Sequence, residues 1–180
     1  MKTLYVTLRD SKSIERTIKD LEAYKDSLLS KNERFVKRLA EIGVTVAKAT
    51  LANGQGDSER SAKFYLFFAN ANGVSTGQII ITSTPHVDDK GRKFYPHLAW
   101  EFGSGIYYNN GNTNPKASEL GMGVGTFPEQ KHAYDDYWWY RDNSNNLHIS
   151  YGTEATMPMY KASKTIIEEI NAIAREIFSE

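Results

Sequence analysis

His97 and Glu101 are the two residues whose types and spacing best fit catalysis or metal binding, because they lie four positions apart. On a helix this spacing puts an imidazole and a carboxylate on one face, where they could hold a metal ion. Tyr95-Pro96 precedes the pair and Gly103 follows it, and these residues favour an extended segment. The zinc-protease pattern H-E-x-x-H is absent. We therefore expect a hydrogen-bonded structural role for both residues, and keep a metal hydrolase as a minor hypothesis.

The remaining catalytic patterns are weaker. Asp88-Asp89 and Asp135-Asp136 are adjacent carboxylates, whereas catalytic pairs face each other across a cleft. Ser104 lacks the G-x-S-x-G surroundings of a hydrolase nucleophile. The glycine-rich run at 121–125 lacks the third glycine and the following helix of a dinucleotide-binding loop. We expect no catalytic site, no metal and no cofactor.

The aromatic run Tyr137-Trp138-Trp139-Tyr140 is the most unusual stretch of the chain. Such clusters stack on sugars or bases, or anchor a protein interface. A strand whose alternating rings fill a core explains the same residues. We favour core and interface roles, and keep a carbohydrate-binding module that uses Tyr137–Tyr140 as the alternative function.

Composition excludes several classes of protein. The 180 residues include 22 Lys and Arg and 22 Asp and Glu, so the net charge is zero. Free-standing binding to nucleic acid or to an anionic membrane needs a strongly positive surface. The chain has no cysteine, which rules out disulfides and thiolate zinc sites. We expect neither a signal peptide nor a membrane span, since no apolar run approaches roughly 20 residues.

The N-terminal part of the chain predicts a strand and then two helices. Residues 3–8 alternate loosely and suit a short strand. One long helix is possible, but Ser30-Lys31-Asn32-Glu33 has the pattern of a capping box, so we prefer a helix boundary near Ser30. Apolar residues recur at helical spacing on both sides of it: Ile14, Ile18, Leu21, Leu28, Phe35, Leu39, Ile42, Val46 and Ala49.

The middle of the chain predicts strands and a long loop. Residues 63–69 and 77–83 are aromatic and β-branched and suit a hairpin, with a longish loop containing residues 70–73 between them. Further strands are expected near 95–102 and 146–151. Residues 103–136 hold six glycines and many asparagines, and we interpret them as a loop or arm that orders against a neighbouring molecule.

The C-terminal part predicts one long helix. Pro158 suits its first position, and Ile166, Ile170, Ile173 and Ile177 form its apolar stripe. Strands in the middle with helices at both ends indicate an α+β fold. We expect a single domain over residues 1–180, with a small antiparallel sheet of four to five strands packed with N-terminal helices and this C-terminal helix.

Three segments in a fixed order resemble one protein family. Residues 99–106 (A-W-E-F-G-S-G-I) are similar to its E-F-G-[TS]-G core, and residues 137–140 lie where an aromatic W-x-Y stretch is expected. Residues 152–162 (G-T-E-A-T-M-P-M-Y-K-A) resemble G-x-x-A-x-P-F-[ML]-x-x-A at the head of the last helix. The family is that of tailed-bacteriophage tail-completion or head–tail joining proteins, also called minor tail proteins, similar to the lambda minor tail protein Z. Met159 departs from the usual Phe, and Met157 adds a residue before Pro158.

This resemblance implies a structural virion protein and not an enzyme. Family members are implied to form a ring, taken as sixfold, which joins the tail tube protein to the head-completion or connector protein at the neck or tail end. Assembly takes place in the bacterial cytoplasm, and DNA passes through the ring without sequence-specific binding. The expected interface and structural residues are Glu101, Phe102, Gly103, Gly105, Trp138, Trp139, Pro158 and Met159. Head-to-tail contacts close such rings.

Overall fold

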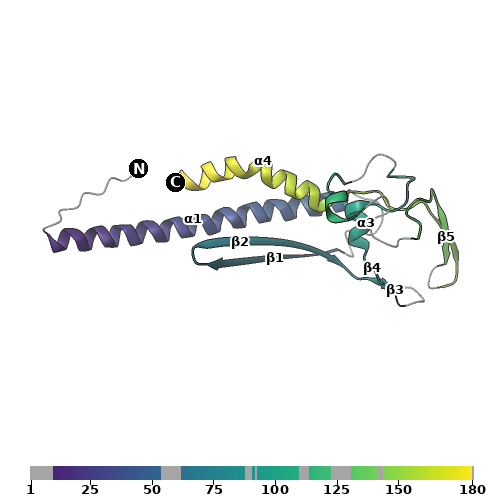
Figure 1. Cartoon of the computed structure of the whole chain (residues 1–180), viewed down its shortest axis with the longest axis horizontal. Coiled ribbons are helices and arrows are strands. Elements are labelled where there is room, and N and C mark those ends of the chain that lie inside the picture. Colours follow the sequence, from purple (N-terminus) through teal and green to yellow (C-terminus); the bar gives the residue numbers. More distant parts are fainter. Residues whose placement is uncertain are drawn as a thin grey trace.

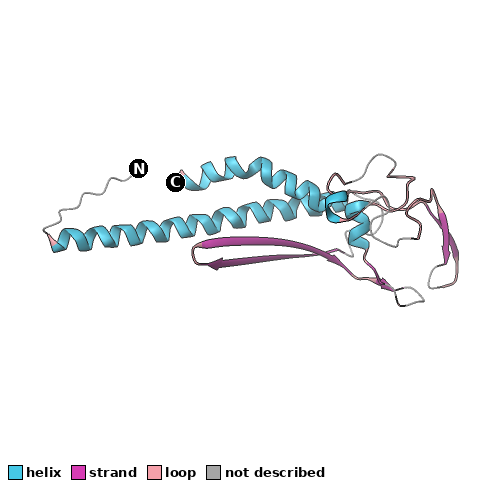
Figure 2. Cartoon of the chain, in the orientation of Figure 1, coloured by secondary structure: helices cyan, strands magenta, loops and turns pink. Residues whose placement is uncertain are grey.

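The computed structural model describes residues 10–53, 62–87, 91, 93–109, 114–122, 131–141 and 144–179. The expected strand at 3–8 lies outside them. The elements are α1 (Ser11–Ala52), β1 (Ala62–Ala71), β2 (Val74–Ser83), β3 (His86–Val87), β4 (Lys93–Phe94), α3 (Pro96–Phe102), η1 (Ser118–Leu120), β5 (Trp138–Arg141), β6 (Leu147–Ser150) and α4 (Pro158–Phe178). The mixture of helices and antiparallel strands is the expected α+β class (Figure 2).

α1 is one helix of 42 residues, so the predicted boundary near Ser30 is wrong. The side chain of Asp10 caps its start by accepting a hydrogen bond from the Lys12 N–H at 3.0 Å. The Glu33 carboxylate does not complete a capping box, because it accepts a hydrogen bond from the Asn70 side chain of β1. The hairpin and α4 cover the second half of α1, and this packing supports a helix longer than its own sequence signals predict.

β1 and β2 form the predicted hairpin, but its turn is tighter than expected. The strands pair in antiparallel register from Ala62 opposite Ser83 to Ala71 opposite Val74. Only Asn72 and Gly73 lie between them, and their φ angles of 53° and 79° match a two-residue turn of type I′. The longish loop expected around residues 70–73 is therefore wrong, because residues 70 and 71 belong to β1.

α4 begins at Pro158, as predicted, and runs antiparallel to α1 (Figure 1). The two helices pack closely because small residues of α1, including Ala40, Gly43 and Ala47, are buried. A Cβ on Gly43 would lie 2.6 Å from Ile79 of β2 and 2.7 Å from Ile166 of α4. Gly43 is thus the point where hairpin and last helix both press on α1.

The expected apolar stripe of α4 is only partly buried. Ile173 and Ile177 are each 4% exposed, whereas Ile170 remains 39% exposed. At the end of the interface the ring of Phe178 meets that of Phe35 edge-on at 5.9 Å. The helix pair thus has a narrow core and leaves apolar side chains on its outside.

Residues 96–102 form the helix α3, so the strand predicted near 95–102 is wrong. Pro96 occupies the first helical position, where a backbone N–H would have no intrahelical partner, so the missing N–H of proline costs no hydrogen bond. The Oγ of Ser83 accepts the backbone N–H of His97 at 3.2 Å. Ser83 therefore supplies the cap that Tyr95, at the N-cap position, does not provide. The helix buries Trp100 and Phe102.

The strands do not form the predicted single sheet of four to five strands. They form three separate antiparallel pairs within the described residues: β1 with β2, β3 with β4, and β5 with β6. The strand predicted near 146–151 is confirmed as β6, and the aromatic run at 138–141 is its partner. The residues of helix α3 were expected to form a strand that joins the hairpin to the later strands in one sheet.

Residues 103–136 are not a free arm where the structure describes them. Asn109 is 2% exposed and Asn114 is 3% exposed, and both are held by side-chain hydrogen bonds to other parts of the fold. Residues 118–120 form the short helix η1. Asn109 and Asn114 thus belong to the packed interior, and composition alone does not distinguish such asparagines from those of a flexible loop.

The molecule is elongated (Figure 1). α3, β3 to β6 and the start of α4 gather at one end, and the first turns of α1 project from the other, beyond the hairpin turn and the end of α4. No helix that the structure describes is both long and apolar enough to span a membrane. The projecting turns carry exposed apolar side chains: Ile14, Ile18, Leu21 and Leu28.

Candidate functional site

Glu101 joins α3 to the first turn of α4. Its Oε2 accepts the backbone N–H of Met159 at 2.8 Å, and its Oε1 accepts that of Tyr160 at 2.9 Å. The carboxylate thus caps a helix that starts 57 positions later in the chain. A negative charge at a helix N-terminus is also favoured by the helix dipole.

Every free donor at the start of α4 has a partner. Pro158 has no N–H, and Glu101 accepts those of Met159 and Tyr160. The N–H of the N-cap residue Met157 donates to the carbonyl oxygen of Trp100 at 3.0 Å, and the intrahelical bonds begin with the N–H of Lys161. Helix starts leave four donors without an intrahelical partner, and a buried start needs all of them satisfied. Pro158 and Glu101 therefore act as one unit that fixes where α4 begins and how it meets α3.

The Glu101 carboxylate also accepts a third hydrogen bond, from the side chain of Asn114. The side-chain Nδ2 of Asn114 donates to Oε1 at 2.7 Å, and the Oδ1 of Asn114 accepts the N–H of Lys116 at 2.9 Å. Asn114 thereby ties the segment that leads to η1 onto the junction of α3 and α4. Sequence reasoning missed Asn114, because an asparagine in a glycine-rich stretch carries no signal of its own.

Burial raises the pKa of the Glu101 carboxyl above its ordinary value of 4.5. The hydrogen bonds from Met159, Tyr160 and Asn114, and the positive charge of Lys161, lower the pKa only in part. A raised carboxyl pKa is common in active sites. Here the oxygens are already occupied by three donors of the fold, which is typical of a structural carboxylate.

His97 does not form a pair with Glu101. Its Nδ1 lies 2.9 Å from the Oγ of Ser83, and burial lowers the pKa of the imidazole, which favours the neutral form of the ring. Within the described residues, no group of three or more His, Cys, Asp or Glu is placed to hold a metal ion. The helical spacing of His97 and Glu101 is thus realised, but each side chain serves a different contact.

The glycine turn after α3 is built around the amide of Asn109. Gly103 has φ 80° and ψ 175°, a backbone region that only glycine adopts readily. A Cβ on Gly103 would overlap the Asn109 side chain. The Nδ2 of Asn109 donates to the carbonyl oxygens of Ser104, Gly105 and Thr153, and its Oδ1 accepts the N–H of Ala155 at 3.0 Å. Asn109 is a central residue of the junction that the sequence did not reveal.

The two segments that carried the main family resemblance meet at this junction. Ser104 and Thr153 exchange backbone hydrogen bonds of 2.8 and 3.0 Å. The N–H of Met157 donates to the carbonyl oxygen of Trp100 at 3.0 Å, and Met157 has a positive φ of 57°. The extra residue before Pro158 thus sits in a strained left-handed conformation that is held by Trp100.

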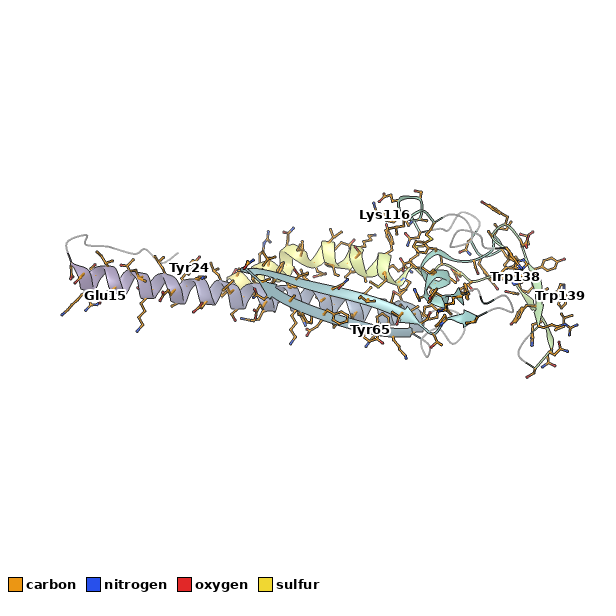
Figure 3. The ribbon with its side chains drawn as sticks, turned by 60° about the horizontal axis from the view of Figure 1, so that its bottom comes forward. Glu15, Tyr24, Tyr65, Lys116, Trp138 and Trp139 are labelled. Carbon is orange, nitrogen blue, oxygen red and sulfur yellow. The ribbon has the colours of Figure 1, made fainter. Side chains whose placement is uncertain are left out.

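The two tryptophans of β5 have different environments (Figure 3). Trp138 is half-buried, and its ring stacks on His132 at 4.9 Å. A Cβ on Gly105 would lie 3.1 Å from the Trp138 ring, so this glycine makes room for the indole. Trp139 is 58% exposed. Successive side chains of a strand point to opposite faces, so Trp138 supports the fold and Trp139 faces solvent.

Further exposed rings surround this end of the molecule. Tyr107 contacts Tyr151 at 5.2 Å between ring centroids, and Tyr137 contacts Tyr151 at 6.3 Å. All three rings are exposed. We call these three rings the tyrosine cluster, and Trp139 is on the same face of its strand as Tyr137 because side chains alternate along a strand.

The other sequence candidates do not converge on a reaction site. Ser104 is buried and its backbone pairs with Thr153, and Asp135 binds the ring of His132 at 2.8 Å. Asp88 and Asp89 lie outside the described residues. An open groove of about 660 Å³ lies where the end of α1 meets the start of α4, lined partly by Thr50 and Tyr160, and neither His97 nor Glu101 lines it.

Phe102 and Met159 complete the set of expected interface residues. Phe102 is 6% exposed and Pro158 is fully buried, so both belong to the core of the junction. Met159 is half-buried on the first turn of α4. Of the eight residues expected at an interface, only Trp139 presents most of its side chain to solvent.

Comparison with protein-family models, with curated proteins and with solved structures found no match.

Replacing the Glu101 cap should destabilise the fold. Glu101→Gln keeps one acceptor oxygen but turns an amide N–H₂ toward a backbone N–H, so one donor of α4 loses its partner. We expect the free energy of unfolding at pH 7 to fall by about 1–3 kcal/mol. Chemical denaturation followed by circular dichroism measures it. Glu169→Gln, on the exposed side of α4, is the control and should change stability by less than about 0.5 kcal/mol. Equal effects of the two changes would contradict the capping role.

The stability difference between the wild type and Glu101→Gln should depend on pH, and the sign of this dependence follows from the pKa of Glu101. The pKa of Glu101 is higher in the folded than in the unfolded chain, so the folded carboxyl holds its proton more tightly. Its titration therefore favours the fold most below the unfolded pKa, and this contribution is lost as the pH rises through the folded pKa. Wild-type stability minus Glu101→Gln stability should fall as the pH rises from below 4.5 and then level off. A difference that grows with pH would mean that the N–H donors outweigh burial.

A side chain at Gly103 should destabilise the protein more than a side chain at another glycine with a positive φ angle. Gly103→Ala meets the Asn109 amide and an unfavourable backbone region, and we expect a loss of about 2–4 kcal/mol in unfolding free energy. Gly121→Ala is a matched control, because Gly121 also has a positive φ of 71° but has open space around it. That change should cost only about 1–2 kcal/mol. Thermal and denaturant unfolding distinguish the two, and the reverse order would refute the packing role of Asn109.

Proposed function

We propose that this chain is a structural virion protein of a tailed bacteriophage, a subunit of a ring at the neck or tail end that joins the tail tube to the head connector. It acts by docking and carries out no reaction. Its partners are further copies of itself, the tail tube protein and a head-completion protein. The family resemblance of residues 99–106, 137–140 and 152–162 underlies this proposal.

The observation that carries the proposal is how the junction uses its polar groups. Glu101, Asn109, Asn114 and Ser83 all bind backbone or side-chain groups of the fold itself. Such arrangements fix the angle between elements and leave no free acid, base or nucleophile for a substrate. A rigid joint of this kind suits a protein whose task is to hold surfaces in place.

Unpartnered apolar surfaces give the second line of support. Ile18 and Leu21 on the projecting part of α1 are 51% and 50% exposed, and Phe67 of the hairpin is 53% exposed. Exposed apolar patches of soluble proteins commonly mark interaction sites. These patches occupy separate elements along the length of the chain, as a subunit with several neighbours requires.

The carbohydrate-binding alternative depends on the tyrosine cluster and Trp139. These rings are exposed, as sugar stacking requires. Trp138 is turned away to His132, so the two indoles do not form one flat platform. The alternative predicts glycan binding that Trp139→Ala abolishes while the protein stays monomeric.

The proposal is tested on the full-length protein and on particles. Native mass spectrometry and negative-stain microscopy should reveal a closed ring, and antibody labelling should place the protein at the particle neck. Trp139→Ala should raise the protein concentration for half-assembly, or for half-binding of the tail tube protein, at least about tenfold, as for an interface anchor. Tyr134→Ala, which removes a ring that is 75% exposed outside the tyrosine cluster, is the control and should leave assembly unchanged.

A protein that stays monomeric at all accessible concentrations and is missing from purified particles would overturn the proposal. Glycan binding by that monomer would favour the carbohydrate alternative instead.

A further inference from the structure

The β1–β2 hairpin has two open edges. Each strand is ten residues long, so each edge extends for about 33 Å. Within the part of the chain that the structure describes, no backbone hydrogen bond joins either strand to any element other than its hairpin partner. About half of the N–H and C=O groups of each strand therefore point away from the pair with no backbone partner.

The hairpin lacks the features that normally protect such edges. Proteins block free edges with charged residues, proline or short strands. Between Ala62 and Ser83 the only charged residue is Lys63, and there is no proline. An isolated two-stranded hairpin is also marginally stable by itself. The length, neutrality and regularity of this edge are typical of a strand that pairs with another.

One face of the hairpin packs on α1, mainly through β2, whereas Phe68 of β1 on that face is still 47% exposed and the other face is open. Gly77 of β2 lies against Val36 of α1, and the Nζ of Lys48 lies 5.7 Å from the ring centre of Phe64. Residues of the alternate set point outward, and the rings of Tyr65 and Phe67 stack on each other at 6.3 Å there. Both rings are about half exposed, and Figure 3 shows Tyr65 on the hairpin beside α1. α1 thus holds the hairpin through one face, while the aromatic face stays exposed and neither strand edge has a backbone partner among the described residues.

We propose that copies of this chain join through these hairpins, with the outer edge of β1 in one copy pairing with the edge of β2 in the next. The inference rests on the proposed ring and names the contact that closes it. β1 and β2 are antiparallel and equal in length, so the order β1-β2-β1-β2 around a rotation axis keeps every neighbouring pair antiparallel. Each copy both offers and receives an edge, and a closed ring leaves no edge free.

A second copy fits this edge better than a foreign strand does. Lys63 is the only charged residue of the two strands, so the β1 edge of one copy meets the β2 edge of the next without like-charge repulsion. The two ten-residue edges match in length over their whole extent. The outer-face rings Tyr65 and Phe67 also come beside the Gln78 and Ile80 positions of the neighbouring β2, which widens the apolar contact.

The absence of cysteine makes a direct test possible. Single-cysteine chains are made on β1 (Tyr65→Cys, Phe67→Cys or Ala69→Cys) and mixed with a mass-tagged chain carrying Gln78→Cys on β2. All four positions lie on the outer face of the hairpin, and a disulfide in the mixture can form only between two molecules. Mild oxidation and mass spectrometry should give the mixed β1–β2 product as the main dimer for at least one β1 position. Circular dichroism and thermal unfolding confirm that each variant is folded.

A second measurement uses charge at the outer face. Phe67→Lys places a like charge on every copy beside the pairing edge and should raise the concentration for half-assembly more than tenfold, while Tyr134→Lys should not. Rings that form without a mixed cross-link, or with only β1–β1 products, would overturn the edge pairing and leave the ring function standing. A chain that forms no oligomer at all would overturn both.

Discussion

The rest of the structure depends on one buried carboxylate. Glu101 accepts the two backbone donors of α4 that Pro158 leaves to be satisfied, and it does so from a helix that Ser83 caps in turn. Both helices begin with proline, so each start is fixed in direction while its remaining donors need an external acceptor. The chain supplies these acceptors from remote segments. Local structure at two helix starts is therefore inseparable from tertiary structure.

This dependence explains which features the sequence could reveal. The start of α4 at Pro158 and the existence of the hairpin were predictable, because proline position, the spacing of apolar residues and β-branched runs are local signals. α3 was not, because its cap is the hydroxyl of Ser83, and Pro96 fits a strand edge or a helix start equally well. One uninterrupted α1 was the less favoured of two predictions, because the capping-box pattern at Ser30 carries no information about the hairpin, whose Asn70 donates a hydrogen bond to Glu33.

The residues of the candidate site likewise divide into those that local sequence signals reveal and those that only the tertiary structure reveals. Glu101, Gly103 and Pro158 stood out in the sequence as types with restricted roles, and all three meet at the junction. Asn109 and Asn114 did not stand out, although both are almost fully buried and hold several backbone groups. An asparagine amide can satisfy donors and acceptors together, so it suits a buried turn as well as it suits an exposed one. Only the fold shows which use is made of it.

Satisfied buried polar groups are concentrated at one end of this molecule, whereas exposed apolar side chains occur along its whole length. The junction at one end satisfies its buried side-chain donors and acceptors internally, and among the described residues no buried side-chain nitrogen or oxygen lacks a partner. The hairpin and the projecting turns of α1 present strand edge, aromatic rings and aliphatic side chains that the chain itself does not cover. Burying this surface is worth roughly 25 cal/mol per Å², a gain that only another molecule can supply. In the ring that we propose, the rigid joint would determine the angle at which these open surfaces meet the neighbouring molecules.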